Sequence, residues 1–157
     1  MTTYLMDTDH VIGLVSSEKS IVERIAKLSD SGKTFSICIT VLSELYWFAK
    51  STAQMDANTA CLTELTADLP VWELDRGAAE IVGEILLEHR ALGTPISRSV
   101  AEIAAVARQK RLVVLSSDPD FQAVRDIRVE NWRSAEGWSA FSVVSAPGTI
   151  NQARPLV

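Results

Sequence analysis

Residues 4–14, YLMDTDHVIGL, place two carboxylates within an otherwise apolar stretch of the chain. The first three residues have the pattern of a short buried strand, and Asp7 and Asp9 follow it with one residue between them. A buried carboxylate is costly unless it is paired or bound to a metal ion. These acids therefore require a partner elsewhere in the chain or a bound cation.

The composition is typical of one globular domain. The chain has 157 residues, 47% hydrophobic and 22% charged, with a net charge of −5. No apolar run approaches the roughly 20 residues that span a bilayer, and no signal peptide is evident, so we expect a cytoplasmic protein with no membrane contact. The net charge argues against a broadly basic nucleic-acid surface but not against a local basic patch. His10 and His89 are too isolated to form a zinc site.

Strand and helix patterns alternate along the chain. We expect strands over residues 4–6, 34–39, 70–75, 111–118 and 127–132, and helices over 21–32, 41–51, 56–67, 76–93 and 97–110. Thr40 is a suitable N-cap for the second helix. The alternation predicts an α/β fold with a mostly parallel central sheet of about five strands, flanked by helices on both faces. The pattern changes after Trp132, so we expect a domain over residues 1–132 and a C-terminal extension or tail over 133–157.

Three acids lie where a parallel sheet places its ligand sites, beyond the carboxyl ends of the strands. They are Asp7, Asp118 and Glu44, which lies one turn into its helix. Each has an ordinary alternative explanation: a helix cap for Asp7, a helix-surface carboxylate for Glu44 and an Asp-Pro turn for Asp118. Together they predict an oxygen-rich pocket for a hard divalent ion, Mg²⁺ or Mn²⁺.

These segments, in this order, resemble the PIN domains, and in particular the VapC toxins of bacterial toxin–antitoxin pairs. The resemblance covers about residues 3–132 and rests on YLMDTDHVIGL, ITVLSELYWF, LGTPIS…IAAVA, RLVVLSSDPDF and IRVENW. It implies a PIN-like three-layer sandwich and a metal-dependent endoribonuclease that hydrolyses RNA phosphodiesters. It also implies a cognate antitoxin that blocks the active-site groove, and a homodimer, which the apolar excess of YWFAK and EIVGEILLEH independently favours.

The resemblance also assigns roles to individual residues. Asp7, Glu44 and Asp118 would be the catalytic and metal-binding acids, with Asp120 as a further candidate ligand. Three polar neighbours would have supporting roles: Asp9, Thr40 and Ser116.

One position departs from the family pattern. Val100 stands where the family usually has an Asp, three residues before its IAA segment. Glu102 is nearby, but two helical residues rotate a side chain by about 200°. We therefore expect Glu102 on the solvent-exposed face of its helix, paired with Arg98. The pocket would then hold three core acids instead of four, which predicts weaker metal binding.

Three basic residues of one helix, Arg98, Arg108 and Lys110, are the best-placed candidates for RNA phosphate contacts, although the same spacing also fits ordinary helix-surface charge.

Two alternative functions stay open. The first is a PIN-like protein that binds antitoxin or RNA but cleaves poorly, which Val100 favours. The second is a haloacid-dehalogenase-like phosphotransferase, because DTDHV at residues 7–11 fits D-x-D-x-[TV], with Asp7 as nucleophile and Asp9 as acid. That alternative leaves Glu44 without a role.

Overall fold

The computed structural model describes residues 3–133, so the expected C-terminal extension lies outside the described residues except for Arg133. The described part forms five strands and seven helices. In chain order they are β1 (Thr3–Met6), α1 (Thr8–Val15), α2 (Lys19–Asp30), β2 (Thr34–Cys38), α3 (Ile39–Lys50), α4 (Met55–Thr66), β3 (Val71–Trp72), α5 (Arg76–Ala91), α6 (Arg98–Lys110), β4 (Val113–Leu115), α7 (Asp120–Ala123) and β5 (Arg128–Glu130).

The expected strands and helices are all present, although most of the strands are shorter than expected. The structure adds α1, which begins one residue after β1 ends, and the short α7. The prediction that Thr40 caps α3 is wrong. The helix begins at Ile39, so Thr40 lies inside its first turn, and the Thr40 hydroxyl donates to Glu102 of α6.

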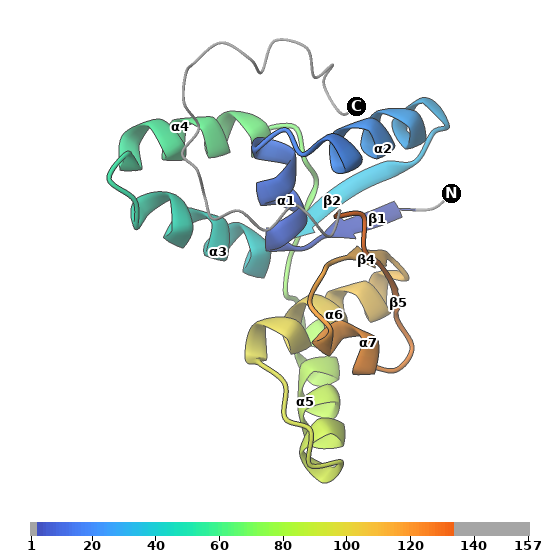
Figure 1. Ribbon diagram of the computed structural model, residues 1–157. Coiled ribbons are helices and arrows are strands. Elements are labelled where there is room, and N and C mark those ends of the chain that lie inside the picture. The colour runs from blue at the N-terminus through green and yellow to red at the C-terminus, as the bar shows by residue number, and fades with distance from the viewer. Residues whose placement is uncertain (1–2, 134–157) are drawn as a thin grey trace.

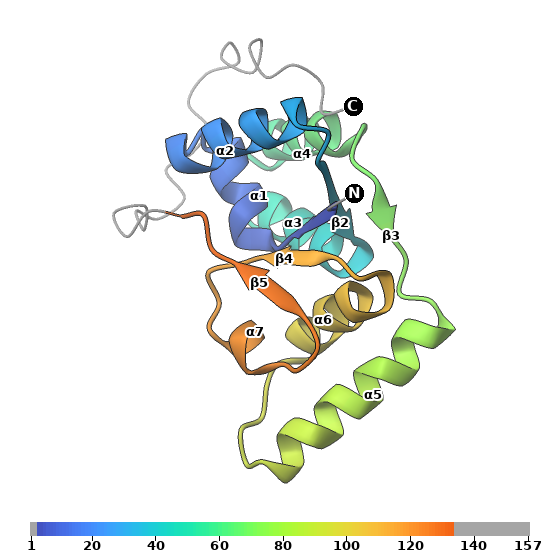
Figure 2. The same ribbon diagram turned by 90° about the vertical axis from the view of Figure 1, so that its right-hand side faces the viewer.

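The strands form one sheet in the order β3-β2-β1-β4-β5, and every neighbouring pair is parallel. The connections from β1 to β3 step outward in one direction, and those from β3 to β5 run in the other. Since such crossovers are nearly always right-handed, the two sets of helices must cover opposite faces. Figures 1 and 2 show α1 to α4 on one side of the sheet and α5 to α7 on the other. The predicted helix-flanked parallel sheet is therefore confirmed. None of the described helices is long and apolar enough to cross a membrane.

The centre of the sheet is also where its strand order reverses. β1 and β4 are neighbours, and Leu5, Met6, Val114 and Leu115 on them are completely buried. Parallel sheets form their binding crevices at such a reversal, beyond the carboxyl ends of the strands. The backbone N–H of Asp7 donates to Leu115 at 3.0 Å, which extends the pairing by one residue beyond β1. The fold thus brings the residues after β1 beside those after β4.

Candidate active site

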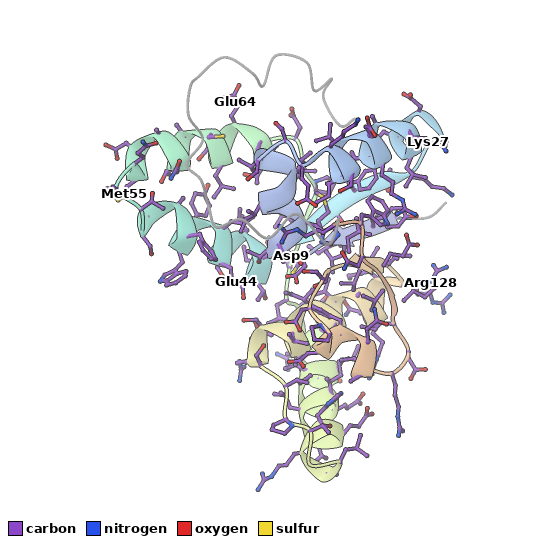
Figure 3. The ribbon with its side chains drawn as sticks, viewed as in Figure 1. Asp9, Lys27, Glu44, Met55, Glu64 and Arg128 are labelled. Carbon is purple, nitrogen blue, oxygen red and sulfur yellow. The ribbon has the colours of Figure 1, made fainter. Side chains whose placement is uncertain are left out.

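A pocket of about 600 Å³ lies at the carboxyl ends of β1 and β4. Four carboxylates line it, those of Asp7, Asp9, Glu44 and Asp118. Its other lining residues are Thr8, Ile12, Phe48, Ser97, Ser99, Val100, Ile103, Ser117, Pro119, Phe121 and Arg133. Figure 3 shows Asp9 of α1 and Glu44 of α3 close to where the helices of the two faces meet. The structure therefore places the three expected core acids around one cavity.

Asp7 is the most buried of these acids, with 8% of its surface exposed. Its Oδ1 accepts from the backbone N–H of Thr8 at 2.7 Å, so it also caps α1. Burial raises the pKa of the Asp7 carboxyl from 3.8 to about 6, with a smaller rise from the charges of Asp9 and Glu44. The hydrogen bonds from Ser116 and Thr8 oppose that rise. The carboxylate of Asp7 thus both caps α1 and lines the pocket.

Ser116 joins the ends of β1 and β4. Its hydroxyl donates to Asp7 Oδ2 at 2.7 Å and accepts from the backbone N–H of Asp118 at 3.0 Å. The Asp118 carboxylate in turn accepts from the backbone N–H of Asp120 at 2.9 Å, which stabilises the turn before α7. The expected Asp-Pro turn and the expected pocket acid are therefore both present at Asp118.

Thr8 bridges two acids, and it was not predicted as a site residue. Its backbone N–H donates to Asp7, while its hydroxyl donates to Glu44 of α3. This contact fixes Glu44 relative to the end of β1. Only the position of Thr8 between Asp7 and Asp9 could have indicated it from the sequence.

Asp9 holds the loop after β4 through Ser117, whose backbone N–H donates to Asp9 Oδ2 at 2.7 Å and whose hydroxyl donates to the same oxygen. The other oxygen contacts His10 Nδ1 at 2.7 Å. Burial pushes the pKa of Asp9 up, but the bonds from His10 and Ser117 outweigh it, and its pKa lies below the ordinary value. The carboxylate of Asp9 is therefore engaged on both oxygens.

His10 is completely buried and was missed as a contributor to the site. Its Nε2 accepts from the backbone N–H of Trp132 at 3.0 Å. Because a neutral imidazole has one donor and one acceptor nitrogen, Nδ1 carries the proton and donates to Asp9. The ring thus ties Asp9 to the end of β5.

Val100 and Glu102 differ in their relation to the pocket. Val100 is buried and lines it, as expected from its alignment with the usual acid. Glu102 does not line it, and the expectation that Glu102 is solvated is wrong, because its side chain is only 16% exposed. It accepts from Thr40 Oγ1 and from Arg98 Nε, each at 2.9 Å. The pairing with Arg98 is confirmed, and the burial arises because α6 packs against α3.

The remaining candidates lie outside the pocket. Asp120 is exposed at the start of α7 and is absent from the lining. Arg108 donates to the backbone oxygen of Arg125 at 2.7 Å, and Lys110 lies 3.4 Å from Asp75. Since α6 rises about 1.5 Å per residue, Lys110 is about 15 Å along the helix from the pocket-lining Val100. The structure therefore separates Arg108 and Lys110 from the acids, whereas Arg98 lies between the pocket-lining Ser97 and Ser99.

The pocket offers hard oxygen donors. No three Asp, Glu, His or Cys side chains within residues 3–133 are arranged to hold a metal ion. Mg²⁺, however, usually binds through one or two carboxylates and keeps several waters. Asp7, Glu44 and Asp118 line the same pocket, and a cation there would stabilise the buried charge of Asp7.

Comparison with known proteins identifies the family. The PIN domain family model matches residues 4–127, and the chain belongs to that family. "Ribonuclease VapC2" of Haemophilus influenzae is 25% identical over 133 residues, covering 84% of this chain and 99% of the relative. The "tRNA(fMet)-specific endonuclease VapC" of Salmonella typhimurium is 28% identical with the same coverage.

Solved structures agree with the family assignment. DNA-bound VapBC from Salmonella typhimurium has a TM-score of 0.76 and 27% identity, covering 84% of this chain and 99% of that one. VapBC2 from Rickettsia felis, bound to a promoter DNA fragment, has a TM-score of 0.77 at 19% identity, covering 83% and 99%, and shows the fold alone. The expected PIN-like fold is therefore confirmed.

We predict that Asp7→Asn stabilises the metal-free protein in a pH-dependent way. The folded state holds the Asp7 proton more tightly than the unfolded state, so stability falls as pH rises from about 4 to about 6. The shift corresponds to about 3 kcal/mol at most. Thermal unfolding in a chelator should show a midpoint raised by several degrees near pH 7 and almost unchanged near pH 4. The exposed Asp30→Asn is the control, and an equal change at both pH values would contradict the prediction.

Proposed function

We propose that this protein is a VapC-type endoribonuclease, the toxin of a toxin–antitoxin pair, that hydrolyses RNA phosphodiesters. The observation that carries the proposal is the pocket in which Asp7, Glu44 and Asp118 meet at the sheet's carboxyl edge. Membership of the PIN family and the ribonuclease and endonuclease names of the relatives support it. A phosphodiester is the substrate class for which an acid-lined pocket with a divalent ion is suited.

We further propose that Mg²⁺ or Mn²⁺ is the cofactor. Asp7 and Asp118 would hold it, with Glu44 acting directly or through water. When bound, such an ion lowers the pKa of a water molecule and offsets charge on the phosphate oxygens. The protein's own part is orientation, since Ser116 and Thr8 hold Asp7 and Glu44 in place. Val100, Ile103 and Phe121 supply apolar surface to the pocket lining, which binds water poorly.

His10 is not a general base in this proposal. It is completely buried, and both ring nitrogens are engaged, by Asp9 and by the backbone of Trp132. His89 is buried as well and contacts the backbone oxygen of Thr94 at 3.0 Å. Proton removal from the attacking water therefore depends on the carboxylates and their ion.

A cognate antitoxin is the partner that we infer. The support is that similar solved chains come from VapBC complexes.

We also propose a homodimer. Trp47 of α3 and Leu87 of α5 are 65% and 67% exposed, as the apolar excess of their segments predicted. Light scattering of the purified protein should give twice the chain mass, and a monomer would contradict the dimer. A cytoplasmic location stays a prediction.

The phosphotransferase alternative is not favoured. The family model that matches is that of the PIN domain. In addition, Asp9, the acid that this alternative needs, is held on both oxygens by His10 and Ser117.

The second alternative is a PIN-like protein that cleaves RNA poorly. It is distinguished from an active ribonuclease by measuring cleavage of bacterial RNA by the purified, antitoxin-free protein with Mg²⁺ or Mn²⁺.

We expect Asp7→Asn to reduce RNA cleavage by about 100-fold or more, because it removes a charged ligand from the site. Isothermal titration should show weaker Mn²⁺ binding, while circular dichroism shows an intact fold. Asp30→Asn should retain wild-type behaviour. Unchanged Mn²⁺ affinity together with unchanged cleavage in Asp7→Asn would contradict the metal-site proposal.

We also expect Val100→Asp to tighten Mn²⁺ binding and raise cleavage, since it adds a carboxylate to the pocket wall. Val100→Asn is the matched control, because it has the same shape as Asp without the charge. Glu102→Gln should change both quantities little, since Glu102 faces Thr40 and Arg98 and not the pocket. Loss of cleavage in Glu102→Gln without a gain in Val100→Asp would show that Glu102 supplies the fourth acid.

A further inference from the structure

Arg133 is the only basic side chain that lines the acid pocket within the described residues 3–133. Its side chain is 15% exposed, so it is not a solvated surface charge. It also lies outside the basic cluster predicted from the sequence. The role of a guanidinium in a pocket lined by four carboxylates therefore needs an explanation.

The side chain of Arg133 is held by Glu18, which lies just before α2. Arg133 Nε donates to Glu18 Oε2 at 3.1 Å, and the Glu18 side chain is 13% exposed. Ser20 donates to the other oxygen of Glu18 at 3.3 Å. The Glu18 carboxylate lies beside Gly13 of α1, where a Cβ would be 3.1 Å from Oε2. Glu18 itself does not line the pocket, whereas Arg133 does.

The backbone that leads to Arg133 is fixed as well. The N–H of Trp132 donates to the buried His10, and the N–H of Arg133 donates to Asn131 Oδ1 at 2.9 Å. The Trp132 ring packs edge-on against Tyr4 and Phe35, with centroids 5.0 and 6.0 Å away. Arg133 is therefore positioned before any ligand binds, which lowers the entropy cost of using it.

The chemistry of this arrangement suits a phosphate. A guanidinium presents five N–H donors in a planar fork that matches phosphate oxygens. An RNA strand that approaches Asp7, Asp9, Glu44 and Asp118 meets repulsion that a metal ion relieves only near itself. A positive charge at the pocket wall relieves it for a further phosphate along the strand.

We propose that Arg133 binds a backbone phosphate of the RNA substrate at the acid pocket and that Glu18 positions it there. The inference rests on the proposed ribonuclease function. It assigns the substrate contact to the residue after β5, which lines the pocket, in place of Arg108 and Lys110 at the far end of α6, which do not.

The first test measures RNA binding without cleavage. In the Asp7→Asn background, a labelled single-stranded oligouridylate is titrated at several salt concentrations by fluorescence anisotropy. Adding Arg133→Gln should weaken binding about tenfold at low salt and reduce the slope of log K against log salt by about 0.7, the value for one phosphate contact on a single strand. Arg128→Gln is the matched control, since Arg128 is exposed on β5 and lies away from Asp9 and Glu44 in Figure 3.

The second test uses the otherwise wild-type chain with bulk bacterial tRNA and Mn²⁺. Arg133→Gln should raise KM about tenfold and change kcat less than about threefold. The KM of Arg133→Lys should lie between those of the wild-type chain and Arg133→Gln. Glu18→Gln should raise KM while retaining the salt slope, because the positive charge remains. Thermal unfolding of each variant is measured first, and the assays are run at a temperature at which all variants are folded.

The outcomes separate the two proposals. A salt slope in Arg133→Gln equal to that of Arg128→Gln overturns the phosphate role and leaves Arg133 and Glu18 as a structural ion pair. Absence of cleavage by the wild-type chain overturns the proposed function, whatever the binding slopes show. A reduced slope together with a raised KM supports both.

Discussion

The hydrogen bond from the Ser116 hydroxyl to Asp7 is the contact on which the candidate site depends. Ser116 follows β4 and Asp7 follows β1, and the same hydroxyl accepts the backbone N–H of Asp118. One neutral oxygen thus sets the spacing of two acids from opposite ends of the chain. Because Ser116 is 2% exposed, water does not replace it readily, and the strand ends are held together from within.

The acids at this edge of the sheet share a kind of partner. Hydroxyl groups donate to each of Asp7, Asp9, Glu44 and Glu102, from Ser116, Ser117, Thr8 and Thr40 respectively. A hydroxyl satisfies the oxygen lone pairs of a carboxylate without cancelling its charge, whereas a lysine or arginine would do both. The hydroxyl partners of Asp7, Asp9 and Glu44 therefore leave the negative charge of these acids in place, which favours a divalent ion. Glu102 differs because Arg98 also pairs with it, and it is the one that does not line the pocket.

Much of the fold and the main acids could be predicted from the sequence because both follow from local patterns. Alternating strands and helices predict a parallel sheet, and strand-end acids must then lie at one edge. The burial of Glu102 could not be predicted in this way, since its partner Thr40 is 62 residues distant and belongs to another helix. The same holds for Arg133, whose position depends on Glu18, 115 residues earlier. Helical periodicity describes which face a residue occupies, but not which other helix covers that face.

The end of β5 is also where the core and the pocket come closest along the chain. The last strand ends at Glu130, and the aromatic packing of Trp132 closes the core. A chain that stopped at Trp132 would keep every strand and helix described here. It would nevertheless lack the guanidinium at the pocket wall. Within the described residues, the last aromatic residue of the core and the last residue of the pocket lining are therefore neighbours, and a truncation that keeps the core intact can still remove part of the pocket.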